Sequence, residues 1–169
     1  MTIADTKATT SDDALYDLIA GELEARLPHR KPIEAFLTAI RSLPPGLRAM
    51  AATYELDVSI TLDDLGWHFG NWHHVGLAAE TIQGLRELGA DRMAQLVTDA
   101  FHAAQRFWSE LGSPNWSRWY HGSPLEESVK SLNREAWEIW DKLPQGLYSY
   151  WLSYARRYPE RMVNGLQPA

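Results

Sequence analysis

Three histidines and three carboxylates lie close together in sequence between positions 63 and 80, and these side chains are the best suited to chemistry. They are Asp63, Asp64, His68, His73, His74 and Glu80. Imidazole and carboxylate groups hold zinc, iron or manganese in proteins, and helical metal sites space them three or four residues apart. Asp64 and His68 have that spacing, whereas His68 and His73 are five residues apart. One hypothesis is therefore a small metal-dependent hydrolase that uses Asp64 and the three histidines.

The same segment also has a purely structural interpretation. The order Thr-Leu-Asp-Asp at positions 61–64 is typical of a capping box, in which Thr61 begins a short helix. The carboxylate of Asp64 would then accept a hydrogen bond from the backbone of Thr61. The histidines would lie at the edge of an aromatic cluster with Trp67 and Trp72. We favour this interpretation, and we expect neither a bound metal ion nor any other cofactor.

A second candidate for acid–base chemistry is the pair Asp99 and His102, which are three residues apart and are followed by Arg106. A carboxylate that orients a histidine is half of a general-base arrangement. No serine or threonine is placed to act as the nucleophile, and polar pairs of this kind are common on helix surfaces. The sequence therefore predicts a protein without enzymatic activity.

The elements that must position these residues are helices, because apolar residues recur at steps of three and four in every long segment. No run alternates with a period of two between turn residues, as a strand would. We predict an all-α fold, a single-domain bundle of about eight helices over residues 11–165, after a disordered lead-in at residues 1–10. Phe101 and Trp140 lie in the middle of long apolar stripes, so we expect both side chains to be buried.

Composition places the chain among ordinary soluble proteins. Its 169 residues suit one domain, and 45% are hydrophobic and 22% are charged. The lack of cysteine excludes a disulfide framework, a thiolate nucleophile and a cysteine-ligated metal. No apolar run approaches the roughly 20 residues of a membrane span, and the first residues lack the apolar core of a signal peptide. We therefore expect a cytoplasmic protein that does not enter a membrane.

The net charge of −6 is concentrated in the middle of the chain. Residues 54–110 contain nine acidic and three basic residues, whereas acids and bases are nearly balanced before and after this segment. No cluster of lysine and arginine suggests direct binding to nucleic acid. An acidic surface instead suits a basic protein partner. We predict that the carboxylates of this segment are exposed and bind the partner: Asp57, Asp63, Asp64, Glu80, Glu87, Asp91 and Asp99.

Positions between residues 40 and 158 carry the pattern of a known family. The pattern comprises Leu43-Pro44 with Arg48, Tyr54 and Val58, Phe69-x-Asn71, and Leu85-x-x-Leu88-Gly89-Ala90-x-x-x-Ala94. It resembles an uncharacterised bacterial domain family typified by the Neisseria DNA-mimic protein. The resemblance implies an all-helical fold and an acidic surface that imitates DNA and binds a DNA-binding protein. The family pattern Asn-Gly-Gly-Phe is not retained, since Leu62-Asp63-Asp64-Leu65 occupies that register here.

Together these observations predict a non-enzymatic protein-binding module. Its acidic face would engage a basic partner, either a DNA-binding protein or a toxin that it neutralises. The metal-dependent hydrolase is the alternative, and metal analysis of protein purified without a histidine tag would distinguish the two. The sequence leaves both a monomer and a homodimer open.

Overall fold

The computed structural model describes residues 11–28 and 32–163, so the predicted lead-in at residues 1–10 and the end of the predicted domain lie outside the described residues. The fold is all-α, and eight of the helices in these two ranges have seven residues or more, which confirms the predicted number. None of the helices in these ranges is both long and apolar enough to cross a bilayer. The elements are α1 (Asp12–Arg26), α2 (Ile33–Ser42), α3 (Pro45–Leu62), α4 (Leu65–Asn71), α5 (Val75–Glu87), α6 (Asp91–Gln105), α7 (Trp108–Leu111), α8 (Trp116–Tyr120), α9 (Pro124–Trp140), β1 (Pro144–Leu147), α10 (Tyr148–Arg157) and the 3₁₀ helix η2 (Pro159–Met162).

Helices α3 and α5 approach each other closely because the residues between them are small. A Cβ atom on Gly84 of α5 would lie 2.9 Å from the carbonyl oxygen of Ala49 and 3.2 Å from its Cα, so glycine is needed for this distance. The contact is also polar, since the Thr81 hydroxyl donates to the carbonyl oxygen of Ala52 at 2.8 Å. The pair α3 and α5 therefore forms a rigid centre on which the other helices pack.

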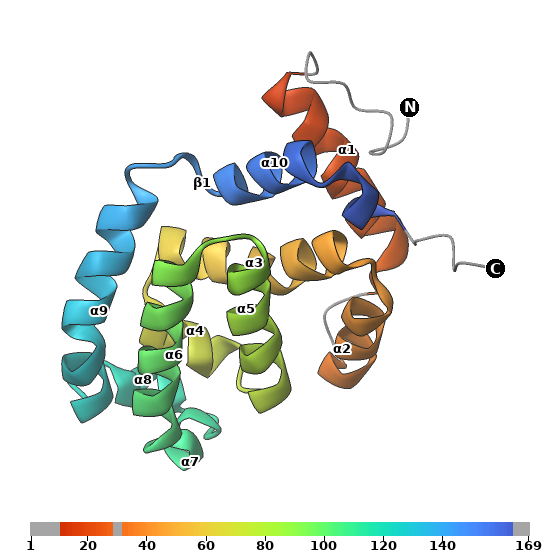
Figure 1. Ribbon diagram of the computed structural model, residues 1–169. Helices are drawn as coiled ribbons and strands as arrows, with labels where there is room; N and C mark the ends of the chain where they lie inside the picture. The colour runs from red at the N-terminus through yellow and green to blue at the C-terminus, as the bar shows by residue number, and fades with distance from the viewer. Residues whose placement is uncertain (1–10, 29–31, 164–169) are drawn as a thin grey trace.

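Two groups of buried side chains share α3 as a common wall. One lies where α1, α2 and α10 pack on α3, and it includes Leu37 and Trp151. The other lies among α3, α4, α5, α6 and α9, and it includes Phe69 and Phe101. Figure 1 shows the same division, with α1 and α10 across the top of the molecule and α6 and α9 at the centre and left. The polar atom of Trp151 is satisfied inside the core, because its Nε1 donates to the Thr53 hydroxyl at 2.9 Å.

The predicted burial is confirmed for Phe101 and is wrong in part for Trp140. The Phe101 side chain is 8% exposed in the second core group. Trp140 is only half-buried, although it packs against the same group. Its Nε1 donates to the Asp57 carboxylate at 2.9 Å, and the need to reach this acceptor holds the indole at the edge of the core.

The predicted capping box at Thr61 is wrong, because α3 continues through Thr61 to Leu62. The Thr61 hydroxyl donates instead to the carbonyl oxygen of Asp57 inside the helix, at 2.8 Å. The N-cap of α4 is Asp64, whose Oδ1 accepts a hydrogen bond from the backbone N–H of Trp67 at 2.7 Å. The side chain of Ile60 is buried near the end of α3, and an aspartate caps a helix as well as a threonine does.

We expect the substitution Asp64→Ala to lower the free energy of unfolding by about 1–3 kcal/mol. It removes the α4 cap and the acceptor of the buried Tyr120 hydroxyl, which donates to Asp64 Oδ1 at 2.8 Å. Urea unfolding of Asp64→Ala, Asp64→Asn and Thr61→Ala would measure the effect. Asp64→Asn keeps one acceptor oxygen and should cost less. A larger loss for Thr61→Ala than for Asp64→Ala would contradict the observed cap.

Candidate functional site

The three histidines of the hydrolase hypothesis each have a separate structural partner. His68 is buried, and its Nδ1 lies 2.9 Å from the Ser59 hydroxyl, which joins α4 to α3. Burial lowers the pKa of His68 to about 4, so the ring is neutral at pH 7. The His73 ring stacks on Trp108 with 4.1 Å between centroids. The expected position at the edge of an aromatic cluster therefore holds for His73 but not for buried His68, and the partner ring is not one of the two that were expected. His74 caps α5, and its Nε2 lies 2.8 Å from the Glu34 carboxylate.

The contact between Ser59 and His68 was not foreseen from the sequence. A serine hydroxyl beside an imidazole can form a nucleophile and base pair in enzymes. Here the hydroxyl also donates to the Glu55 carbonyl oxygen of its own helix at 2.8 Å, and both side chains are buried. The contact between Ser59 and His68 therefore serves as a buried polar link between α3 and α4. The two residues are nine positions apart in different helices, so no local pattern signals the contact.

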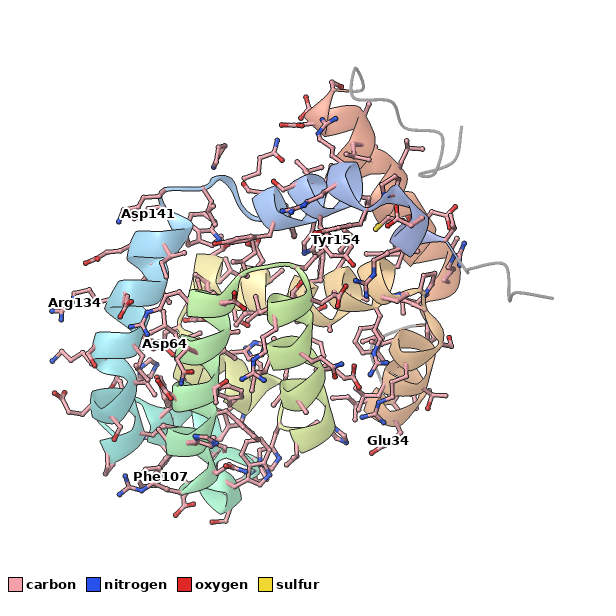
Figure 2. All side chains as sticks on the ribbon, viewed as in Figure 1. Glu34, Asp64, Phe107, Arg134, Asp141 and Tyr154 are labelled. Carbon is pink, nitrogen blue, oxygen red and sulfur yellow. The ribbon has the colours of Figure 1, made fainter. Side chains whose placement is uncertain are left out.

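The structure does not bring the four residues of the hydrolase hypothesis together. Figure 2 shows Asp64 beside α9, whereas Glu34, the partner of His74, lies on α2 at the opposite side of the molecule. Within residues 11–28 and 32–163, no three histidine, aspartate or glutamate side chains form a group that could hold a metal ion. The proposed set of Asp64, His68, His73 and His74 is therefore not a metal site in this fold.

Two of the predicted partner-binding carboxylates, Asp57 and Glu80, are buried, and the expectation that they are exposed is wrong. Asp57 accepts hydrogen bonds from the backbone N–H of Leu147 at 2.7 Å and from Trp140 Nε1 at 2.9 Å. These bonds fasten the α9–β1–α10 connection to α3. Burial raises the pKa of Asp57, although the two hydrogen bonds oppose this effect. The Asp57 carboxylate is thus hydrogen-bonded inside the protein and does not face a partner.

Glu80 is held between two arginines. Its carboxylate oxygens lie 2.8 Å from Nε of Arg41 and 2.8 Å from Nε of Arg48. Burial alone would raise the pKa of Glu80, but the hydrogen bonds and charges of Arg48 and Arg41 outweigh it and lower the pKa. Glu87 is also paired, with Arg161 at 2.9 Å and with the Tyr154 hydroxyl.

These pairs neutralise part of the acidic surplus of residues 54–110 in the folded protein. The arginines that neutralise Glu80 and Glu87 are Arg41, Arg48 and Arg161, and all three lie outside that segment. The folded surface is therefore less acidic around α5 than the sequence suggests. Folding brings together charges that are distant in sequence, so the net charge of a segment does not give the charge of a surface.

The remaining predicted carboxylates lie in two places. Asp91 and Asp99 are exposed and lie eight residues apart along α6, which puts them on one face of that helix. Asp63 is exposed and Asp64 is half-buried at the turn between α3 and α4. Partial burial and the charge of Asp64 raise the pKa of Asp63, although His121 opposes this effect. The turn thus concentrates negative charge.

Two exposed apolar side chains accompany the carboxylates of this turn. Leu62 is 73% exposed at the end of α3, and Trp137 of α9 is 40% exposed. Trp137 is anchored at the same end of α3, because its Nε1 donates to the carbonyl oxygen of Ile60 at 3.2 Å. We call this surface the α3–α4–α9 face. We define it as two neighbouring parts. Leu62 and Asp63 line one side of the turn, and Asp64, Glu126, Glu127 and Trp137 line the other side.

The α3–α4–α9 face is hollowed and rigidly supported. A hollow of about 360 Å³ lies between α9 and the turn, and Asp64, Glu126, Asn133 and Trp137 are among its lining residues. The Asn133 side chain accepts a hydrogen bond from the backbone N–H of Leu65 at 3.0 Å, which ties α9 to α4. Glu126 accepts one from the backbone N–H of Gly122 at 2.5 Å. The carboxylates are therefore positioned by the fold.

Sequence reasoning identified Asp63 and Asp64 but missed the other members of this face. Glu126 and Glu127 lie outside the acidic segment, in the first turn of α9. Trp137 falls off the apolar stripe of α9, whose members include Ala136 and Trp140. A tryptophan off the stripe of an amphipathic helix was the available signal, because such a residue has no place in the helix's own core face.

Comparison with known proteins agrees with this fold. A family model described as DMP19-like protein matches residues 41–157, which extend from the end of α2 to the end of α10 and include the whole α3–α4–α9 face. Neither the curated proteins nor the solved structures contain a match to the chain. The match covers more than half of the sequence and agrees with the family resemblance read from its residues. The chain belongs to the DMP19-like protein family.

Proposed function

We propose that the protein is a non-enzymatic, cytoplasmic protein-binding module that engages a basic protein through its exposed carboxylates. The observation that carries the proposal is the turn between α3 and α4, where the exposed carboxylate of Asp63 lies beside the exposed side chain of Leu62. The family resemblance supports a partner that binds DNA, which the acidic surface would imitate. A basic toxin that the protein neutralises is the second class of partner.

The physical basis is electrostatic attraction at a distance. Exposed carboxylates speed and orient the encounter with a basic surface, and salt screens this effect over a Debye length of about 8 Å at physiological ionic strength. Asp57 and Glu80 do not contribute, because their charges are satisfied inside the protein. The proposal therefore rests on Asp63, Asp91 and Asp99, which are exposed.

We expect the triple substitution Asp63→Lys, Asp91→Lys and Asp99→Lys to weaken partner binding and its dependence on salt. Asp64 is left intact, because it caps α4 and its loss would destabilise the fold. Affinity capture from the native host at low and high salt would identify the partners, and the captured protein would then be titrated against each variant. Losing three negative charges and gaining three positive ones should reduce affinity at least about tenfold at low salt.

A charge-matched control separates a local effect from a change in net charge. The control reverses Asp13, Asp17 and Glu160, which are exposed and lie on α1 and η2. It alters the total charge by the same amount and should retain most of the affinity. Circular dichroism would establish that both triple variants are folded. If the first variant binds the same partner with the same salt dependence as the wild type, the exposed carboxylates of residues 54–110 are not the binding site.

A further inference from the structure

We propose that the α3–α4–α9 face receives a segment of the partner that carries an apolar side chain beside lysine or arginine, with Leu62 and Trp137 as the anchoring contacts. This inference rests on the proposed function and names the surface and the chemistry of its occupant. It differs from a purely electrostatic encounter, because the contact energy would come from apolar burial and the charges would set the choice of partner.

The apolar part of the face leaves side-chain surface open to solvent. Leu62, Val75 and Trp137 are the exposed large hydrophobic side chains in the described part of the chain. Leu62 lies at the end of α3, and Trp137 is hydrogen-bonded to Ile60, two residues before it. The N–H group of Trp137 already donates to Ile60, so the exposed part of the indole offers an apolar and π surface. Exposed tryptophan held in place by the fold is typical of an interface hot spot.

The charges around this apolar centre select a basic occupant. Asp64, Glu126 and Glu127 line the hollow with Trp137, and Asp63 lines the other hollow with Leu62. The bases near these carboxylates are Lys130 and His121. Lys130 lies 3.4 Å from Glu127 and His121 lies 3.9 Å from Glu126, so neither base neutralises the pair Asp63 and Asp64 by direct contact. A lysine or arginine of the partner would relieve the repulsion between these two carboxylates and could lie over the Trp137 ring.

The shape of the face also suits a segment with mixed side chains. The hollow of about 360 Å³ beside Asp64 and Trp137 has room for the long side chain of lysine or arginine. A second hollow of about 270 Å³ lies on the side of Leu62 and Asp63, and its lining includes Val58 and Trp72. The Leu62–Asp64 turn therefore separates an acidic hollow from a mixed one, in which Val58, Leu62 and Trp72 supply the apolar part of the wall. A basic side chain and an apolar side chain of the same segment would fill the two hollows.

The test is selection from a library of short random peptides displayed on phage, with the purified full chain as bait. We expect the enriched peptides to combine lysine or arginine with an apolar residue. Resynthesised peptides would be titrated by calorimetry against Leu62→Ser and Trp137→Ala, each of which should lose about tenfold or more in affinity. The matched control is Val75→Ser, which removes an apolar side chain on α5 whose exposure lies between those of Leu62 and Trp137, and it should bind within about twofold of the wild type.

A variant that should bind more tightly excludes misfolding as the general explanation for changes in affinity. Lys130→Ala removes the base that lines the acidic hollow, and it should strengthen binding of the same peptides. The inference is overturned if no peptides are enriched, if the enriched peptides are acidic, or if Val75→Ser weakens binding as much as Leu62→Ser. It is also overturned if sedimentation shows concentration-dependent self-association that Leu62→Ser abolishes, because the occupant would then be a second copy of this chain.

The experiments distinguish failure of the proposed function from failure of the apolar anchor. If the captured host protein loses affinity with the triple aspartate reversal but binds Leu62→Ser and Trp137→Ala normally, the carboxylates bind the partner and the apolar anchor is wrong. If the peptides behave as expected but no basic host protein is captured, the face is a binding site and the proposed function is wrong.

Discussion

Phe101→Ala should lower the free energy of unfolding by about 3–5 kcal/mol. The ring lies in the core between α4 and α6, with centroids 5.3 Å from Phe69 and 5.7 Å from Trp108. Alanine would leave a cavity that these rigid aromatic neighbours cannot fill, so both the transfer energy and the packing contacts are lost. Guanidinium unfolding followed by circular dichroism would measure the change.

Phe107→Ala is the matched control for this substitution, because Phe107 is half-buried and lies six positions further along the chain. Its ring contacts Trp119 with 5.8 Å between centroids, at the surface end of the same region. We expect a clearly smaller loss for Phe107→Ala. Equal losses at the two positions would contradict the packing of α4, α6 and α9 around Phe101.

Removing both Arg41 and Arg48 should lower the free energy of unfolding by about 2–4 kcal/mol at neutral pH. Because both arginines are partly exposed, this loss is smaller than the loss expected for a fully buried ion pair. The double substitution to alanine leaves the Glu80 carboxylate buried without its partners. Glu80→Gln should cost less, because the two arginines it leaves behind can turn towards water. Thermal or urea unfolding of the three proteins would establish the order.

The dependence on pH gives this comparison a sharper test. The two arginines lower the pKa of Glu80 below its ordinary value of 4.5, so its ionisation stabilises the fold above that pH. In the wild type this contribution is lost as the pH falls below about 4.5, and in Glu80→Gln it is absent. In the double arginine variant burial alone remains and raises the pKa, so acid should relieve the cost. A double variant that loses stability on acidification in parallel with the wild type would contradict this account.

The fold was predictable because helix periodicity depends on local sequence. Apolar steps of three and four identify the long helices, and the Ser-Pro-Leu-Glu order at 123–126 begins α9 as such an order should. The boundary between α3 and α4 was not predictable in the same way. Thr61 and Asp64 are both good caps, and the choice between them depends on the burial of Ile60 against distant helices.

The site was harder to predict, because exposure depends on the tertiary structure. Asp57 and Glu80 lie off the apolar stripes of their helices, which predicts exposure for a helix that is packed on one side only. α3 is covered on several sides and α5 packs directly on it, so off-stripe positions on both helices face other elements. Asp63 lies at a helix end and is exposed, so the predicted exposure is confirmed there.

Trp137 was not singled out from the sequence. Its aromatic character and high content of apolar surface suggest a core residue, and an amphipathic helix can be read from its stripe without it. The structure shows that its indole N–H is fixed on the end of α3 while part of the ring stays exposed. Only the arrangement of α3, α4 and α9 brings this ring to the same surface as Leu62 and Asp63.

The measurement that tests the binding face most directly is amide hydrogen exchange of the full chain with and without the captured basic partner, or with the selected peptide if no partner is captured. The account predicts increased protection at the end of α3, the beginning of α4 and the length of α9, and unchanged exchange in α1 and α2. Protection confined to helices outside this face, such as α1, α2 or α6, or no protection at saturating partner, would contradict a binding site at the α3–α4–α9 face.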